Sequence, residues 1–284
     1  MIGAIIGDIV GSVYEFNNHK SKEFELFSKD STFTDDTVMT IAVADFITLE
    51  HGNPSEERYC VMMYDWYMKY PELSYGARFK NWIEQFGKDS RNWKRNNSFG
   101  NGAAMRISSV GVSSRTLENA LYDAELLTKS SHNHKEGIKG AQAVAGLMVV
   151  ARKEKNKSKL KAFVEKEFGY NLNKTVDELR ETYEYNETCQ GTVPEAIICF
   201  LESKDFEDAI RNAISIGGDS DTLACITGSI AEAYYEEIPE WILKEAINRL
   251  PIRMKDLIYK VYEWEYYGNE EHIKLVVKLT HFVG

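Results

Sequence analysis

The chain has 284 residues, of which 43% are hydrophobic and 27% charged, a length and composition that allow one sizeable buried core. A formal net charge of −10 opposes the approach of DNA or RNA, so we expect no passive binding of nucleic acids. The cysteines, Cys60, Cys189, Cys199 and Cys225, have neither CxxC pairing nor regular spacing, which excludes a zinc knuckle and a disulfide framework.

The N-terminal segment is an apolar stretch in which glycines recur at every fourth position before a carboxylate. The positions are Gly3, Gly7, Gly11 and Glu15. Residues four apart share one face of a helix, so the spacing predicts a smooth helical stripe that ends in Glu15. Two interpretations stay open: either the stripe packs tightly and Glu15 is solvated, or Glu15 lies at a metal or catalytic centre.

The same segment bears on localisation. Asp8 interrupts the apolar run and no basic residue precedes it, which argues against a signal peptide. No other stretch is apolar for long enough to span a bilayer. We therefore expect a cytoplasmic protein that does not enter a membrane.

An acidic cluster opens the next predicted helix, residues 38–49. The cluster reads Thr34-Asp35-Asp36-Thr37. Side-chain oxygens at the start of a helix can cap its free backbone amides. Two adjacent carboxylates exceed what a cap requires, so a metal-binding role competes with capping here.

A polar stretch that carries Trp93 leads into a glycine-bearing loop. The loop reads Ser98-Phe99-Gly100-Asn101-Gly102-Ala103-Ala104-Met105-Arg106. Exposed backbone amides at such a turn can hold a phosphate, although Gly-Asn-Gly is also a common turn sequence. Further along, His132 and His134 are separated by one residue and lack the His-x3-His spacing of two ligands on one helical face, so no zinc site is expected there.

Helical periodicity dominates the rest of the chain. Apolar residues at three- and four-residue spacing predict helices over residues 117–127, 137–150, 193–201, 206–216, 223–235 and 240–264. Pro194, Pro239 and Pro251 each precede such a run, where a proline in the first turn costs no hydrogen bond. Strand patterns are nearly absent and no linker interrupts the chain, so we expect an all-α, single-domain compact helical bundle over residues 1–284.

A second acidic cluster lies between two of these helices. It reads Gly217-Gly218-Asp219-Ser220-Asp221-Thr222. A calcium EF-hand is excluded, because no glycine stands at the sixth loop position and Ile230 occupies the twelfth, where a glutamate is required. Small residues in the helices that follow both acidic clusters would allow close approach. Four converging aspartates would repel one another, so a shared site requires divalent metal with oxygen ligands.

Together these motifs resemble the ADP-ribosylglycohydrolases, the family typified by dinitrogenase reductase-activating glycohydrolase and the eukaryotic ADP-ribosylhydrolases. The resemblance spans most of the chain, and several motifs in the same order are more specific than any one of them. They are Gly7-Asp8-x2-Gly11-x3-Glu15, the segments 33–39, 98–106 and 217–222, Ser131-His132, and Thr192-Val193-Pro194.

The resemblance implies an all-α hydrolase that cleaves the glycosidic bond between ADP-ribose and a modified target at a centre of two divalent cations, Mg²⁺ or Mn²⁺. The implied metal ligands are Thr34, Asp35, Asp36, Asp219, Asp221 and Thr222. The implied catalytic residues are Glu15 and Asp36. Substrate contacts are implied for Trp93, Ser98, Phe99, Gly100, Asn101, Gly102, Met105 and His132, with the aromatic rings at the adenine and the glycine turn at the diphosphate.

The expected partner is an ADP-ribosylated substrate, a modified protein, and we expect a monomer. The linkage stays open among ADP-ribosyl-arginine, ADP-ribosyl-serine, a nucleic-acid adduct and a free metabolite. A catalytically inactive ADP-ribose-binding or structural member of the family is the alternative, and the complete set of acidic and hydroxyl positions argues against it. A helical metal-dependent phosphohydrolase is disfavoured, because the sequence has no His-Asp doublet.

Overall fold

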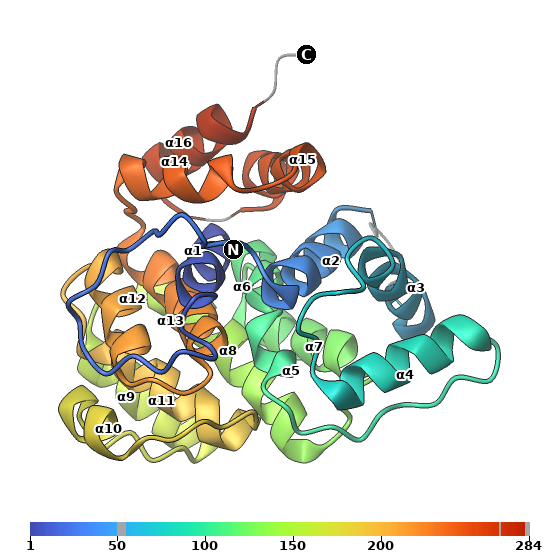
Figure 1. Ribbon diagram of the computed structural model, residues 1–284, viewed down its shortest axis with the longest axis horizontal. Helices are drawn as coiled ribbons and strands as arrows, with labels where there is room; N and C mark the ends of the chain where they lie inside the picture. Colours follow the sequence, from blue (N-terminus) through green and yellow to red (C-terminus); the bar gives the residue numbers. More distant parts are fainter. Residues whose placement is uncertain (50–54, 267, 282–284) are drawn as a thin grey trace.

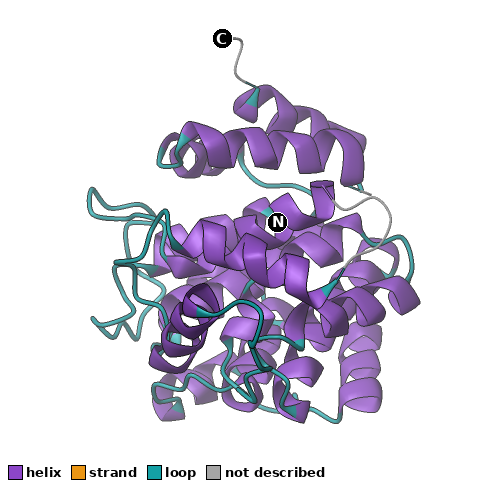
Figure 2. Cartoon of the chain, turned by 90° about the vertical axis from the view of Figure 1, so that its right-hand side faces the viewer, coloured by secondary structure: helices purple, strands orange, loops and turns teal. Residues whose placement is uncertain are grey.

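Helices make up the regular secondary structure of the computed structural model, which describes residues 1–49, 55–266 and 268–281 (Figure 2). Within those residues there is no strand, only two isolated β-bridges. The elements are α1 (Ile2–Gly11), α2 (Asp35–Leu49), α3 (Glu56–Tyr67), α4 (Ala77–Lys88), α5 (Gly102–Met105), α6 (Ser108–Ser113), α7 (Leu117–Thr128), α8 (Lys135–Lys153), α9 (Lys157–Phe168), α10 (Val176–Thr182), α11 (Cys189–Leu201), α12 (Phe206–Ser215), α13 (Ser220–Tyr235), α14 (Glu240–Asn248), α15 (Ile252–Lys260), the π-helical turn η1 (Val261–Glu265) and α16 (Glu270–Thr280). The predicted all-α class is confirmed.

One predicted proline position is wrong, and another divides a predicted helical stretch as expected. The stretch 240–264 divides at Pro251, which caps α15 and disfavours helical geometry in the residue before it. Pro194 lies inside α11 rather than in its first turn, since the Thr188 hydroxyl accepts a hydrogen bond from the Gly191 amide and so starts the helix several residues earlier.

Helices α1 and α13 pack with their backbones in contact at the centre of the molecule (Figure 1). A Cβ atom added at Gly7 would lie 2.0 Å from the carbonyl oxygen of Ala224, and one added at Gly11 would lie 2.3 Å from the Cα of Asp221. Only glycine permits this approach, so the stripe does pack tightly. The contact brings the end of α1 against the first turn of α13.

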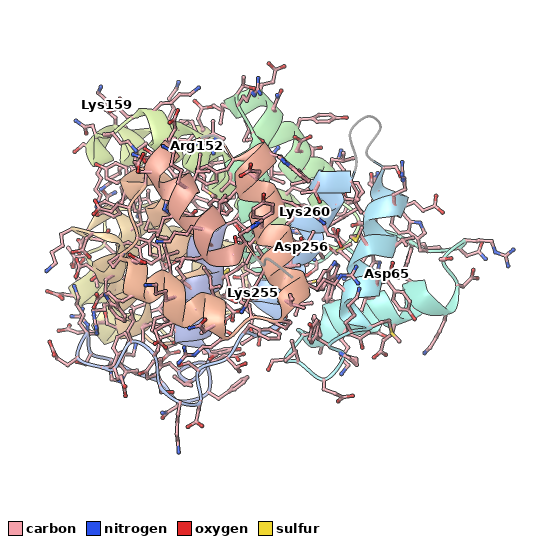
Figure 3. The ribbon with its side chains drawn as sticks, turned by 90° about the horizontal axis from the view of Figure 1, so that it is seen from above. Asp65, Arg152, Lys159, Lys255, Asp256 and Lys260 are labelled. Carbon is pink, nitrogen blue, oxygen red and sulfur yellow. The ribbon has the colours of Figure 1, made fainter. Side chains whose placement is uncertain are left out.

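The C-terminal helices α14, α15 and α16 lie across one side of this pair, seen at the top of Figure 1 and from above in Figure 3. Buried Glu232 of α13 ties η1 and α16 to α1. Its carboxylate accepts hydrogen bonds from the Gly3 amide at 2.8 Å and from the Tyr262 hydroxyl, and it pairs with the Met1 amine at 2.7 Å and with Nε2 of His272 at 3.1 Å. Burial opposes ionisation, but the Met1 amine and His272 outweigh it and hold the pKa of Glu232 well below its ordinary value.

Within the described part of the chain, no helix combines the length and the apolar character that crossing a membrane requires.

Candidate functional site

A cavity of about 380 Å³ opens where the first turns of four helices converge. Asp35 begins α2, Arg78 lies in the first turn of α4, Gly102 begins α5 and Asp221 lies in the first turn of α13, and all four line the cavity. The first turn of a helix has unpaired backbone amides and the positive end of the helix dipole. The N-terminal ends of these four helices therefore lie at the cavity wall.

The two acidic clusters meet at one end of the cavity. The Thr222 hydroxyl donates to Asp36 at 3.0 Å, and the Thr34 hydroxyl lies 3.4 Å from a carboxylate oxygen of Asp221. Hydroxyl and carboxylate groups of the two motifs thus interlock, although the motifs lie far apart in the sequence. We refer to Glu15, Asp35, Asp36, Asp219 and Asp221, with the hydroxyls of Thr34 and Thr222, as the acidic cluster.

Asp8 fixes the N-terminal half of the acidic cluster. Its buried carboxylate accepts hydrogen bonds from the Thr34 amide at 2.9 Å and hydroxyl at 2.7 Å, and from the Thr37 amide at 3.0 Å and hydroxyl. It therefore caps the first turn of α2 from another helix and holds the turn that bears Asp35 and Asp36. Sequence reasoning missed this role, because a cap is normally sought next to its own helix.

Glu15 reaches the acidic cluster from a turn rather than from a helix. The prediction that the helical stripe continues to Glu15 is wrong, since α1 ends at Gly11. Carboxylate oxygens of Glu15, Asp219 and Asp221 lie within 4.8 Å of one another, a spacing suited to one cation. The alternative of a solvated Glu15 is disfavoured by its place on the cavity wall.

The segment after Glu15 is held against the turn that precedes α13. Asn18 accepts a hydrogen bond from the Gly218 amide at 3.0 Å, and the Lys20 ammonium donates to the Ile216 carbonyl at 2.6 Å. Gly217 and Gly218 have φ values of 69° and 80°, which other residues adopt only with strain. This turn presents Asp219 and Asp221 to the cavity.

The surroundings of the acidic cluster oppose the ionisation of its carboxylates. Burial raises the pKa of Glu15 to about 8, with further contributions from Asp219 and Asp35. Burial, with Asp8 and Asp219, raises the pKa of Asp35 to about 7. Burial and neighbouring carboxylates, Asp35 beside Asp36 and Asp219 beside Asp221, raise the pKa values of Asp36 and Asp221 well above the ordinary value. Carboxylate and hydroxyl oxygens are the ligands that Mg²⁺ and Mn²⁺ prefer, so the residues present fit such cations.

The glycine loop lines the same cavity and is held on both sides. Isolated β-bridges join Asn97 to His132 and Gly100 to Thr188. The Asn101 amide donates to the Glu187 carbonyl at 2.8 Å, and the Asn101 side chain donates to Asp219 at 2.7 Å. The loop therefore lies directly beside the acidic cluster, so one ligand can contact both.

Most of the predicted site residues line this one cavity. They are Glu15, Asp35, Asp36, Ser98, Phe99, Gly100, Asn101, Gly102, Met105, His132, Asp219, Asp221 and Thr222. Thr34 is buried behind the wall, where it bonds to Asp8.

The two predicted aromatic residues separate. Phe99 lines the cavity and is 38% exposed. Its ring is tilted against the ring of His134, with the ring centres 5.2 Å apart. Trp93 is not among the described residues that line the cavity. It packs edge-on against Trp82 at 6.5 Å and Phe86 at 6.3 Å. This placement favours a packing role for Trp93, because aromatic rings gain most by burial.

Several lining residues carry no motif that sequence reasoning could use. Arg78 and Phe79 come from α4, and Tyr185 and Glu187 come from the segment before α11. Arg106 also lines the cavity, and its place at the end of the glycine loop was the one available indication.

Comparisons with known proteins agree with this geometry. A profile of the ADP-ribosylglycohydrolase family matches residues 1–266. ADP-ribosylhydrolase ARH3 of Mus musculus is 26% identical over 312 residues, which cover 84% of this chain and 84% of that protein. ADP-ribosylarginine hydrolase Tri1 of Pseudomonas putida (strain GB-1) is 24% identical over 87% of this chain and 73% of its own.

Among solved structures, a chain described as an ADP-ribosylglycohydrolase-related protein complex matches with a TM-score of 0.68, covering 99% of this chain and 96% of that one. At 18% identity this match shows a common fold alone. The family profile, in contrast, spans both acidic clusters and the glycine loop. The predicted resemblance is therefore confirmed, and the chain belongs to the ADP-ribosylglycohydrolase family of hydrolases.

Proposed function

We propose that this protein is a metal-dependent hydrolase that cleaves the glycosidic bond between ADP-ribose and a modified target, using two divalent cations, Mg²⁺ or Mn²⁺. The observation that carries the proposal is the position of the acidic cluster directly beside the glycine loop in one cavity of about 380 Å³. A ligand such as ADP-ribose could place its diphosphate on the glycine loop and its distal ribose at the acidic cluster.

Different parts of the cavity wall suit different parts of ADP-ribose. The turn of Gly100, Asn101 and Gly102, together with His132, would hold the diphosphate. The exposed ring of Phe99 would contact the adenine. Ser98 and Met105 would complete the wall, and the distal ribose would then reach the acidic cluster.

Hydrolysis replaces the bond from the anomeric carbon to the target with a bond to water, through an oxocarbenium-like state. Glu15 is half-buried, whereas Asp36, Asp219 and Asp221 are buried, so Glu15 is better placed to exchange a proton with water or the leaving group. Asp36 is the second catalytic candidate. Cations bound by the acidic cluster would offset the carboxylate charge and orient the ribose hydroxyls.

The proposed target is a modified protein, and the proposal does not specify which linkage is cleaved. One relative is named ADP-ribosylhydrolase ARH3 and another an ADP-ribosylarginine hydrolase, so relatives of similar identity do not single out one linkage. A monomeric state, a cytoplasmic location and a single domain over residues 1–284 stay predictions.

A panel of defined substrates tests the proposal. Proteins and peptides ADP-ribosylated on arginine or serine are incubated with the purified chain, and released ADP-ribose is measured with Mg²⁺, with Mn²⁺ and with EDTA. We expect release that EDTA abolishes and either cation restores. An absence of release from every substrate under all metal conditions would contradict the proposal.

Glu15→Gln tests the catalytic assignment in the same assay. We expect turnover to fall about a hundred- to ten-thousandfold, the usual contribution of a positioned acid–base group, while part of the ADP-ribose affinity is kept. Glu23→Gln is the matched control, because Glu23 is exposed on the same connection and is not part of the cavity wall. Near-normal rates in Glu15→Gln would return Glu15 to a supporting role.

A further inference from the structure

Arg106 is a buried cation beside the glycine loop, and its guanidinium group has a defined partner on each side. Nε donates to the Gly102 carbonyl at 2.5 Å, and Nη1 points to the sulfur of Met63 at 3.3 Å. The planar group lies over the Phe79 ring, 5.0 Å from its centre. Nη2 lies 3.1 Å from Nδ1 of His132. Arg106 is 3% exposed, so these contacts fix its orientation.

The contact with His132 determines where the imidazole proton lies. An arginine side chain has only donors and stays protonated in proteins, so Nδ1 of His132 has to accept. The Ser131 hydroxyl, 2.8 Å from the same nitrogen, could act as donor or acceptor and does not decide the matter. A neutral imidazole that accepts at Nδ1 carries its proton on Nε2.

The Nε2 side of His132 faces the glycine loop. Cβ atoms added at Gly100 and at Gly102 would each lie 3.6 Å from Nε2, so this nitrogen lies over the turn between them. Among the residues that the structure describes, none accepts a hydrogen bond from Nε2. The ring lines the cavity, and its free donor position is therefore directed to a ligand on the turn.

We propose that Arg106 is a positioning residue that locks His132 as the neutral tautomer with its proton on Nε2, so that the imidazole donates to an anionic group bound on the glycine loop. The anion is the diphosphate of ADP-ribose, and this part of the inference rests on the proposed function. The locked tautomer itself rests only on the contacts of Arg106.

The electrostatic surroundings agree with a neutral ring. Burial, followed by the nearby charges of Arg106 and Arg78, lowers the pKa of His132 well below its ordinary value. A neutral histidine without a fixed partner would exchange between two tautomers. One of them would present a lone pair to the anion and repel it, so fixing the proton on Nε2 favours binding.

Nitrogen NMR of the ligand-free protein tests the tautomer directly. In ¹⁵N-histidine-labelled protein, with the His132 signals assigned by their loss in His132→Gln, long-range proton–nitrogen correlations identify the protonated nitrogen. We expect the proton on Nε2 in the unmodified chain and a mixture of tautomers in Arg106→Met. Arg106→Lys keeps a donor-only cation and should restore most of the Nε2–H form.

Arg78→Met is the matched control. It removes a cation from the same cavity wall that also lowers the pKa of His132, but Arg78 bonds to Asn96 rather than to the imidazole. The tautomer of His132 should therefore be unchanged in Arg78→Met. Circular dichroism of each variant confirms that the helices are retained.

ADP-ribose titration tests whether Arg106 acts through His132. Loss of one hydrogen bond to a charged group should weaken ADP-ribose binding about tenfold in Arg106→Met and by a similar factor in His132→Gln. The double variant should bind no more weakly than His132→Gln, because the two residues form one unit. Additive losses would indicate that Arg106 contacts the ligand by itself and would overturn the positioning role.

The two arms separate the possible failures. A proton on Nδ1, or a mixture of tautomers, in the unmodified protein would overturn the inference whatever the ligand. A locked Nε2–H tautomer in a chain that shows no measurable ADP-ribose binding would support the lock and contradict the proposed function instead.

Discussion

Asp35 is half-buried on the cavity wall among carboxylates, so it is suited to test the proposed cation binding. Asp35→Asn removes one charge without changing size. We expect ADP-ribose release to fall at least a hundredfold and Mg²⁺ affinity to fall with it, since ligand charge dominates the binding of hard cations. Without metal, the melting temperature should be equal or higher, because repulsion is relieved. Calorimetry with Mg²⁺ and circular dichroism measure both effects.

Asp30→Asn is the control for this change. Asp30 is exposed on the same connection before α2 and is not part of the cavity wall. The isosteric change there should leave Mg²⁺ affinity and hydrolysis unaltered. Unchanged Mg²⁺ affinity in Asp35→Asn would show that the acidic cluster does not use this ligand.

The different surroundings of Phe99 and Trp93 predict opposite effects of truncation. Phe99→Ala should weaken ADP-ribose binding about tenfold, because a stacked ring contributes on the order of 1–3 kcal/mol, with little change in melting temperature. Trp93→Ala should leave the affinity unaltered and lower the free energy of unfolding, by less than the roughly 3–5 kcal/mol of a fully buried ring. Fluorescence titration and thermal melts separate the two. Equal affinity losses in both variants would mean that Trp93 also contacts the adenine.

The sequence could identify a site residue where that residue lies in a short motif with other functional residues. Both acidic clusters and the glycine loop stood out because several functional groups lie within a few positions. Arg78 and Glu187 did not stand out, because each is a single charged residue outside any motif. Its place on the cavity wall depends on segments that lie far away in the sequence. Trp93 lies in the polar stretch that leads into the glycine loop, but its indole packs against the rings of Trp82 and Phe86.

At the scale of elements, the contact between α1 and α13 makes Gly7 decisive. Helix propensity alone predicts that Gly7→Ala stabilises the protein by about 1 kcal/mol. The added Cβ would lie 2.0 Å from the backbone oxygen of Ala224, however, and backbone cannot yield as a flexible side chain does. We expect the clash to prevail and to cost about 3 kcal/mol or more.

Chemical denaturation of Gly7→Ala measures this loss of stability. Gly76→Ala is the matched control, because nothing lies within 4 Å of a Cβ added there. Its stability should stay near that of the unmodified chain. A Gly7→Ala protein as stable as the control would mean that α1 can shift without affecting α13.

Helix periodicity identified α7, α8 and α12 closely because apolar residues recur at helical spacing along each of them, although the middle of α8 is buried on all sides. Periodicity does not specify partners, so it did not indicate that α1 rather than α2 packs most closely on α13. Periodicity also predicted a helix from the N-terminus to Glu15. The helix ends at Gly11 instead, and the segment that follows is held by the hydrogen bonds of Asn18 and Lys20.

For the whole molecule, the raised pKa values predict how stability depends on pH and metal. Between the ordinary value of 4.5 and about 8, Glu15 of the folded, metal-free chain holds a proton that the unfolded chain has released. The free energy of unfolding should therefore fall as the pH rises through this range. Mg²⁺ bound as proposed would replace these protons, so the stabilisation by Mg²⁺ should be larger near pH 8 than near pH 6.

Thermal melts at several pH values, with EDTA and with Mg²⁺, measure this dependence. Glu15→Gln should flatten part of the slope in EDTA, which separates the acidic cluster from other titrating groups. A metal-free melting temperature that rises from about pH 6 to pH 8, with no such change in Glu15→Gln, would contradict the prediction.

The contact between α1 and α13 also joins segments that lie far apart in the sequence, which has a consequence for synthesis and cleavage. A nascent chain cannot assemble the acidic cluster until the segment with Asp219 and Asp221 has left the ribosome, so the site would form only after that segment has been made. Non-local contacts of this kind slow folding relative to other helical proteins. If the chain is divided at the short connection between α8 and α9, one fragment keeps Glu15 and Asp35 and the other keeps Asp219 and Asp221. Neither fragment alone has the complete set, so activity would report their reassembly.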